Sequence, residues 1–541
     1  MAAEPVKRQS FTGRNAFIFA AIGSAVGLGN IWRFPYQAYE NGGGAFLIPY
    51  LVALLTAGIP YLIYEFSIGH RFRGSAPVAY RRLHRAAEPI GWWQVMIAAV
   101  ISIYYAAIIA WSLSYTVFSV NKAWGDDPET FLMGTHLQVA ETVAPGLDFV
   151  PGVLVPMIVV WVLLLVILAL GVQKGLGLVS QIFIPLLLIA FAALVIIALT
   201  FPGAGVGLNA LFTPDFSKLT DPGVWIAAYT QIFFSLSIGF GIMITYSSYM
   251  KRRTNLTGSA LTVGFANSSF ELLCGIGVFA TLGYMAQASG VDISEVASQG
   301  IGLAFVVFPT IMNMAPLGSL LGVLFFGSLV IAGFTSLVSL VEVVIAAVAD
   351  KTGWSRIPST LVVGGGLAVI SILFFATTTG LPLLDTTDAF VNAIGIAGAA
   401  VTALIVVAWI LRRMERVTNH ANSVSNIKVG SLFRIILGIV TPVILAILLV
   451  QKLISFATEG YEGYPGWFLG VFGWGMSISL VVIAVLLSFI PWHHRSALHT
   501  QHTHEDLTND PHSGTGPDAP PEGEAPNASA PTSVTRKEEL Q

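Results

Sequence analysis

The sequence is poor in charged residues and in cysteine. Asp, Glu, Lys and Arg make up only 10% of its 541 residues, whereas hydrophobic residues make up 55%. A soluble domain carries roughly 25% charged residues, so this composition excludes a water-soluble globule. The single cysteine, Cys274, excludes an internal disulfide, a cysteine-based zinc site and a cysteine-ligated iron–sulfur cluster.

Long apolar runs, in contrast, are abundant. A run of about 20 apolar residues is long enough for a helix to cross a bilayer. Twelve such runs occur, at 14–38, 44–69, 89–121, 152–170, 175–199, 223–250, 257–288, 317–349, 358–377, 385–411, 430–455 and 465–490. The sequence therefore predicts an all-α integral membrane protein with twelve transmembrane helices.

The basic residues indicate the orientation of these helices. An even number of spans places both termini on one side, and lysine and arginine gather on the cytoplasmic side. With the N-terminus inside, only four of the 26 basic residues fall outside: Arg33, Lys122, Lys218 and Lys452. We therefore expect both termini in the cytoplasm.

The composition changes after residue 490. His, Pro, Ser, Thr and acidic residues replace the apolar ones, a change that is typical of disorder. We expect a cytoplasmic N-terminus at 1–13, a membrane domain at 14–490 and a disordered cytoplasmic tail at 491–541.

Two of the predicted spans contain glycine-rich interruptions. The first span carries Gly27 and Gly29 followed by Asn30, and the sixth carries Gly239 and Gly241. Glycines alone would favour close helix packing. Breaks at matching positions of two halves instead indicate two inverted five-helix repeats, helices 1–5 and 6–10, with helices 1 and 6 unwound at the membrane midplane. Unwound backbone there offers carbonyls to a cation and N–H groups to an anionic group.

Several motifs carry a family resemblance. Residues 27–35 (GLGNIWRFP), 40–46 (ENGGGAF), 231–237 (QIFFSLS) and 332–336 (AGFTS) resemble the neurotransmitter:sodium symporter family, in particular its bacterial amino acid branch. The resemblance implies a sodium-coupled secondary active symporter in the bacterial inner membrane. It would import a neutral, apolar amino acid such as alanine, methionine or leucine by alternating access, and it would not be an enzyme.

The resemblance implies two sodium sites built from neutral oxygens. The first would use the backbone or side chains of Ala25, Asn30, Ser235 and Asn267 together with the substrate carboxylate. The second would use the carbonyls of Gly23, Val26 and Ala332 and the hydroxyls of Thr335 and Ser336. Without the resemblance, adjacent Thr and Ser in a membrane helix would more often bond their own backbone.

The resemblance also implies a substrate site. The carboxylate would meet the N–H groups of Leu28 and Gly29 and the Tyr105 hydroxyl, and the ammonium would meet the carbonyls of Ala25, Phe234 and Ser235, with Ser237 adding an oxygen. The side-chain pocket would be formed by Ile101, Phe234, Phe240, Ser336 and Leu340. None of these is charged, which favours an apolar substrate side chain because an unpaired charge would be costly there.

Charged residues in or near the spans match the gates of the family. Arg33 and Asp388 would form an outer gate bridged by Gln231, above a lid of Tyr105 and Phe240. Arg8 and Asp350 would form an inner gate near Phe11, which stands where the family commonly has tryptophan. The alternative for both ion pairs is simple anchoring at the membrane interface.

Glu271 lies four residues after Asn267, on the same helix face. In chloride-dependent relatives this position is a small polar residue beside the chloride. Glu271 would supply that negative charge itself, so the resemblance implies transport without chloride. It leaves open whether Glu271 takes up a proton on the return step, which would give proton antiport. Glu65 resembles a glutamate that braces the unwound first helix.

Other functions fit the sequence less well. A channel needs a continuous polar lining, and a membrane-embedded enzyme needs a nucleophile with its base or a metal cluster, but no predicted span contains a histidine. A sodium-coupled carrier of another small amine or osmolyte is the closest rival. Gly29 favours amino acids over it, because amine carriers usually have an aspartate there. The expected partners are the substrate and the lipid bilayer, without nucleic acid; an accessory subunit or a homodimer stays open.

Overall fold

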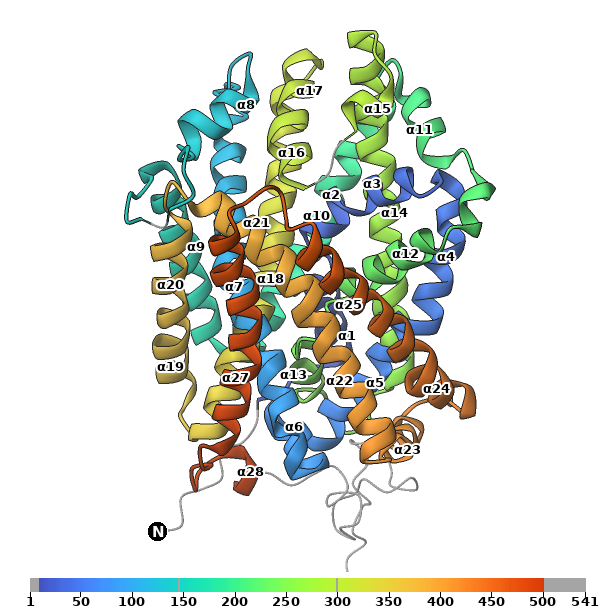
Figure 1. Cartoon of the computed structure of the whole chain (residues 1–541), viewed down its shortest axis with the longest axis vertical. Helices are drawn as coiled ribbons and strands as arrows, with labels where there is room; N and C mark the ends of the chain where they lie inside the picture. The colour runs from blue at the N-terminus through green and yellow to red at the C-terminus, as the bar shows by residue number, and fades with distance from the viewer. Residues whose placement is uncertain (1–8, 145, 298–299, 501–541) are drawn as a thin grey trace, which may run out of the picture.

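The computed structural model describes residues 9–144, 146–297 and 300–500, and within these residues every regular element is a helix. Ten helical runs are long and apolar enough to cross a membrane. They are Gly43–Phe72 (α4 and α5), Arg85–Phe118 (mostly α7), Pro151–Ala169 (α9), Val172–Leu199 (mostly α10), Leu256–Ser289 (α14), Gly318–Thr352 (α18), Arg356–Phe375 (α19 and α20), Gly380–Ile410 (α21 and α22), Ser431–Thr458 (α24 and α25) and Gly466–Phe489 (α26 and α27). The all-α membrane architecture is therefore confirmed (Figure 1).

The first predicted span is broken. It consists of α1 (Arg14–Ala25), α2 (Leu28–Trp32) and α3 (Phe34–Glu40), and the chain bends by 55° at the break after α1. Counted as one crossing, this bent pair brings the spans in the described part of the chain to eleven.

The sixth predicted span, 223–250, is divided into two short helices. These are α12 (Pro222–Ser235) and α13 (Ile242–Ser247), and neither alone crosses a membrane. The predicted count of twelve transmembrane helices is therefore not confirmed in the described part of the chain. However, the start of α1 and the end of the described chain, α28 (Ala497–Thr500), lie at the same end of the molecule (Figure 1). This arrangement agrees with the prediction that both termini lie on one side of the membrane.

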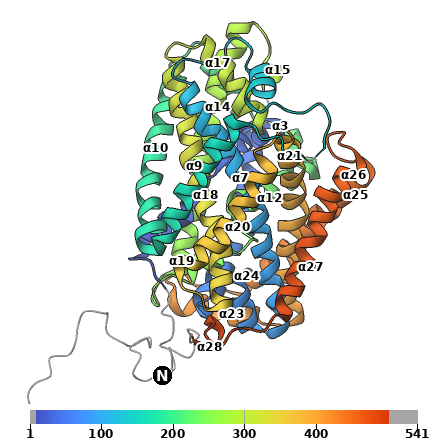
Figure 2. The same cartoon turned by 90° about the vertical axis from the view of Figure 1, so that its left-hand side faces the viewer.

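The remaining helices lie at the two ends of the bundle (Figures 1 and 2). At the end with the termini are α6 (Ala76–Leu83), α23 (Met414–Val424) and α28; at the opposite end are α8 (Pro128–Thr130), α11 (Ala204–Phe212), α15 (Ile293–Val296), α16 (Gly300–Gly302) and α17 (Phe308–Met314).

The helix α18 forms the centre of the bundle. Its most apolar stretch is 89% buried, against 28% for the last span, whose outer face is therefore available to lipid. The helix packs along α7 and also contacts α1, α2 and α13. Both broken spans therefore lie against the best-buried helix of the molecule.

The predicted start of the disordered tail, at residue 491, requires correction. Trp492 is buried and its indole N–H donates to Glu88 Oε1 at 2.9 Å, while the backbone N–H of His493 donates to Lys351 O at 3.2 Å. A buried acidic group and the end of α18 thus hold the chain in place, and it is ordered as far as Thr500. The tail from 501 onward lies outside the described residues.

Candidate functional site: a cavity between two broken helices

Backbone conformation explains both breaks. Val26 and Gly27 are extended, which ends α1 at Ala25 and lets α2 begin at Leu28. In the sixth span Ser237, Gly239 and Gly241 have φ angles of 52°, 92° and 81°. Positive φ is incompatible with a right-handed helix and is easily adopted only by glycine. The two Gly-x-Gly motifs thus mark the breaks, as the sequence predicted.

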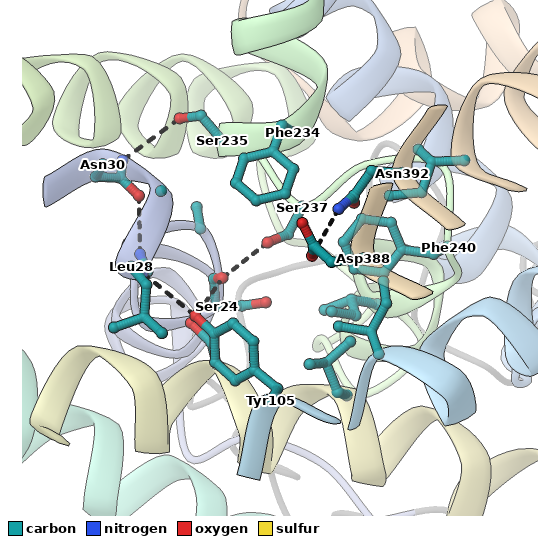
Figure 3. A pocket seen from close by; sticks show the side chains of 18 of the residues that line it. Ser24, Leu28, Asn30, Tyr105, Phe234, Ser235, Ser237, Phe240, Asp388 and Asn392 are labelled. Atoms are coloured by element: carbon teal, nitrogen blue, oxygen red, sulfur yellow. Dashed lines mark hydrogen bonds between the residues drawn. The ribbon is translucent and has the colours of Figure 1, made fainter. Parts of the chain in front are cut away.

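A cavity of about 60 Å³ lies between the two breaks (Figure 3). All eleven residues predicted to bind substrate line it: Ala25, Leu28, Gly29, Ile101, Tyr105, Phe234, Ser235, Ser237, Phe240, Ser336 and Leu340. The lining also includes Ser24, Gly27, Tyr104, Ile242, Asn392 and Ile396, which the sequence reasoning missed. Asn392 could have been found, because it follows the gate candidate Asp388 by one helical turn.

The two unwound segments meet on one side of the cavity. The backbone N–H of Leu28 donates to the Tyr105 hydroxyl at 3.2 Å, so two groups expected to bind a carboxylate lie together. The Ser237 hydroxyl donates to Ser24 O at 2.8 Å and joins the two breaks (Figure 3).

The side chains predicted for the first sodium site form one buried cluster. The Asn30 amide donates to Asn267 Oδ1 at 2.9 Å and to Ser235 Oγ at 3.4 Å, and the Asn267 amide donates to the same Ser235 hydroxyl. Asn30 Oδ1 accepts from the backbone N–H of Gly27 at 2.8 Å. Amide and hydroxyl oxygens are ligands that hard cations prefer.

The residues predicted for the second sodium site also come together. The Ser336 hydroxyl on α18 lies 3.4 Å from Gly23 O and 3.4 Å from Val26 O on the first span. The Thr335 hydroxyl bonds its own helix, at 3.0 Å from Ala332 O. Self-bonding therefore describes Thr335, whereas Ser336 reaches across to the break in the first span.

Glu271 is fully buried and hydrogen-bonded by two neutral donors. The Gln231 amide donates to Glu271 Oε1 at 2.6 Å, and the Tyr50 hydroxyl donates to Oε2. The prediction that Gln231 bridges the outer gate is therefore wrong in this structure, because its amide N–H bonds the Glu271 carboxylate instead.

The outer gate residues are not joined. The Arg33 guanidinium lies over the Phe234 ring, 4.8 Å from its centroid. Asp388 accepts instead from the Tyr104 hydroxyl at 2.6 Å and from the Asn392 amide at 2.8 Å. Asp388 also lines the cavity (Figure 3). The expectation of a pocket without charge is therefore wrong at this wall.

At the inner end, aromatic packing closes the path. Phe11 is 1% exposed and packs edge-on against Tyr246 and Tyr249, with ring centroids 5.9 and 6.1 Å away. Phe11 is thus well packed at the position where the family commonly has tryptophan. Asp350 accepts from the backbone N–H of Ser75 at 2.8 Å, and its predicted partner Arg8 lies outside the described residues.

Two further buried acids have defined partners. Glu65 was expected to brace the unwound first span. Its Oε1 instead accepts from the N–H of Gly239 at 3.2 Å, so Glu65 braces the break in the sixth span. Glu342 accepts from the Tyr249 hydroxyl at 2.7 Å and pairs with Arg356 at 2.6 Å. The sequence had suggested no role for Glu342.

Comparison with known proteins agrees with this geometry. The model of the sodium:neurotransmitter symporter family matches residues 8–135 and 124–495. An uncharacterised sodium-dependent transporter of Methanocaldococcus jannaschii is 41% identical over 89% of this chain and 98% of that protein. The sodium- and chloride-dependent taurine transporters of Homo sapiens and Bos taurus are 28% and 29% identical, each over 90% of this chain and 85% of the relative. A family match over nearly the whole chain and a broken-helix cavity lead to one conclusion: the protein belongs to the sodium:neurotransmitter symporter family, whose members couple transport to sodium.

Proposed function

We propose that the chain is a symporter that carries one neutral amino acid together with two sodium ions by alternating access. The observation that carries the proposal is the position of the cavity, between the two broken helices and beside both clusters of neutral oxygens. Substrate and sodium would then share the same unwound backbone. Binding one would organise the site for the other, which is what coupling requires.

The substrate would lie across the breaks. Its carboxylate would replace the hydrogen bond between Leu28 N–H and the Tyr105 hydroxyl, which are 3.2 Å apart, and would complete the first sodium site beside Asn30. Its ammonium would face carbonyls of the breaks. Its side chain would lie among Ile101, Phe240 and Leu340, which favours an apolar side chain.

The buried carboxylate of Glu271 supports transport without chloride. It lies one turn from Asn267, and in its ionised form it would supply a negative charge beside the first sodium cluster. The taurine transporters named above depend on chloride, whereas here a carboxylate accepts the hydrogen bonds of Tyr50 and Gln231. Protonation of Glu271 during the return step would make the protein a proton antiporter.

A carrier of an osmolyte such as taurine is the second candidate. The match to taurine transporters over 90% of this chain favours it. The two candidates differ at the anionic end of the substrate, because a sulfonate is bulkier than a carboxylate and would need more room beside Gly29. The space beside Gly29 is tight, because a Cβ added to this residue would lie 2.2 Å from the Phe234 ring.

A panel of radiolabelled substrates distinguishes these candidates. The protein is reconstituted in liposomes with an inward sodium gradient, and uptake of alanine, methionine, leucine, taurine and glycine betaine is compared. We expect uptake of one or more apolar amino acids and no competition by excess taurine. Uptake of taurine in preference to every amino acid would overturn the substrate assignment. Because transport is proposed to need no chloride, equal uptake from sodium chloride and sodium gluconate is expected.

The proposal places the protein in the cytoplasmic membrane with both termini in the cytoplasm. In the topology predicted from the sequence, all but four basic residues fall on that side, and both ends of the described chain lie at one end of the bundle.

A further inference from the structure

A second cavity lies far from the broken helices, at the end of the bundle where the described chain begins and ends. It has a volume of about 650 Å³ and shares no residue with the first cavity. One wall is formed by the chain before and at the start of α7, and the other by the end of α27 and the segment that follows it. Figure 1 shows α6 and the lower end of α27 at this end of the molecule.

The first wall is positively charged. Arg81, His84 and Arg85 line it. His84 and Arg85 are exposed, and Arg85 forms no side-chain hydrogen bond or ion pair with any residue that the structure describes. The guanidinium of Arg85 is therefore available to bind an anionic ligand.

The one acid of this wall does not cancel that charge. Glu88 is 1% exposed, and its carboxylate pairs with both Arg81 and Lys351. It also accepts from the indole N–H groups of Trp92 and Trp492, at 3.0 and 2.9 Å. Two cations thus surround one carboxylate, and Arg85 adds a further positive charge at the rim.

The second wall is apolar and faces the lipid. Val485, Phe489 and Ile490 line the cavity and are 38%, 80% and 51% exposed. Val485 and Phe489 belong to the last span, which has the least-buried apolar stretch of the ten spans, and Ile490 directly follows it. A ligand of this cavity must therefore combine an anionic group with a hydrocarbon part.

We propose that the cavity binds one anionic phospholipid from the membrane leaflet on the side of the termini. The phosphate would bind Arg85, with His84 and Arg81 beside it, because charge-assisted hydrogen bonds to phosphate suit arginine. An acyl chain would lie along Val485 and Phe489. Basic pockets between transmembrane helices at this boundary select anionic headgroups in this way. The bound lipid would join the end of α27 to the start of α7.

Native mass spectrometry of the full chain tests the proposal. The protein is purified in detergent, stripped of lipid, and incubated with phosphatidylglycerol or with phosphatidylcholine of the same acyl chains. We expect one retained phosphatidylglycerol and at least about fivefold less phosphatidylcholine. Arg85→Gln should lower phosphatidylglycerol retention about fivefold, the factor equivalent to about 1 kcal/mol for one arginine near an anionic surface. Phe489→Ser should lower the retention of both lipids.

Arg413→Gln is the matched control. Arg413 is also exposed and directly precedes α23 at the same end of the bundle, but it does not line the cavity. Unchanged retention is expected for this variant. Equal retention of both lipids, or an undiminished signal in Arg85→Gln, would overturn the proposal. Complete displacement of phosphatidylglycerol by millimolar inorganic phosphate would also overturn it, because the site would then bind a free anion and not a lipid.

Discussion

At the scale of single residues, the site consists of neutral oxygens held in place by one another. Asn30, Ser235 and Asn267 come from three different helices and meet through amide and hydroxyl groups. The sequence identified these residues only through the family motifs, because no spacing along the chain relates them. The partners of Gln231 and Asp388 could not be predicted, since they depend on which side chains the packing brings within reach.

Replacing Ser336 by alanine is expected to weaken sodium binding. The variant loses the hydroxyl that lies within 3.4 Å of three carbonyls of the first span. We expect the sodium concentration for half-maximal uptake to rise about three- to tenfold, as loss of one neutral ligand or hydrogen bond predicts. Ser112→Ala is the control, because its hydroxyl bonds only Ile108 O in its own helix. Equal shifts in both variants would contradict the assignment.

Replacing Glu271 by serine is expected to make transport depend on chloride. The variant removes the buried carboxylic group but keeps the hydrogen-bond donors of Tyr50 and Gln231, which would then be available to an anion. Uptake should be restored by chloride and abolished by gluconate, whereas the unchanged protein should transport equally in both. A variant that is equally active in the two salts would show that Glu271 does not stand in for the anion.

At the scale of elements, the breaks in the first and sixth spans and the loop between α7 and α9 depend on local backbone conformation and packing. The sequence predicted the positions of both breaks because glycine destabilises a helix interior, so paired glycines within a span indicate an interruption. It did not predict that Glu65 braces the sixth span, since this contact depends on how α5 packs against the unwound segment.

Gly239→Ala is expected to destabilise the protein by about 1–2 kcal/mol, the cost of positive φ for a residue with a Cβ. Gly239 has a φ of 92°, so the unwound segment would have to rearrange. Gly205→Ala is the control, because Gly205 is in α11 and a Cβ there would meet nothing within 4 Å. Thermal unfolding measures both variants, and an unchanged midpoint for Gly239→Ala would contradict the conformational argument.

The loop between α7 and α9 should respond to acid. Burial lowers the pKa of His136 to about 4, well below its value of about 6.5 in an unfolded chain. The neutral ring, which packs against Tyr115 and Phe118, therefore stabilises the fold fully above about pH 6.5, and this contribution is lost as the pH falls toward 4. His136→Phe should reduce the fall in unfolding temperature between pH 7 and pH 5. An identical fall in both proteins would contradict the predicted shift.

At the scale of the whole molecule, composition was enough to predict a multi-pass helical bundle. The number of crossings was harder to predict, because a hydropathy pattern does not show whether the two short helices on either side of a break cross the membrane together. The sixth span reads as one run at 223–250 but folds as α12 and α13. The predicted start of the tail was wrong because the contact that orders this segment is distant in sequence. Trp492 and its buried partner Glu88 are separated by 404 residues.

A sodium gradient is expected to drive uptake of the substrate through this cavity. The most direct test is accumulation of the preferred radiolabelled amino acid in proteoliposomes, with an inward sodium gradient or with equal potassium on both sides, for the unchanged protein and for Asn30→Ala. We expect accumulation above the external concentration only with the sodium gradient, and its loss in Asn30→Ala. Accumulation that is equal in potassium, or that survives in the variant, would contradict it.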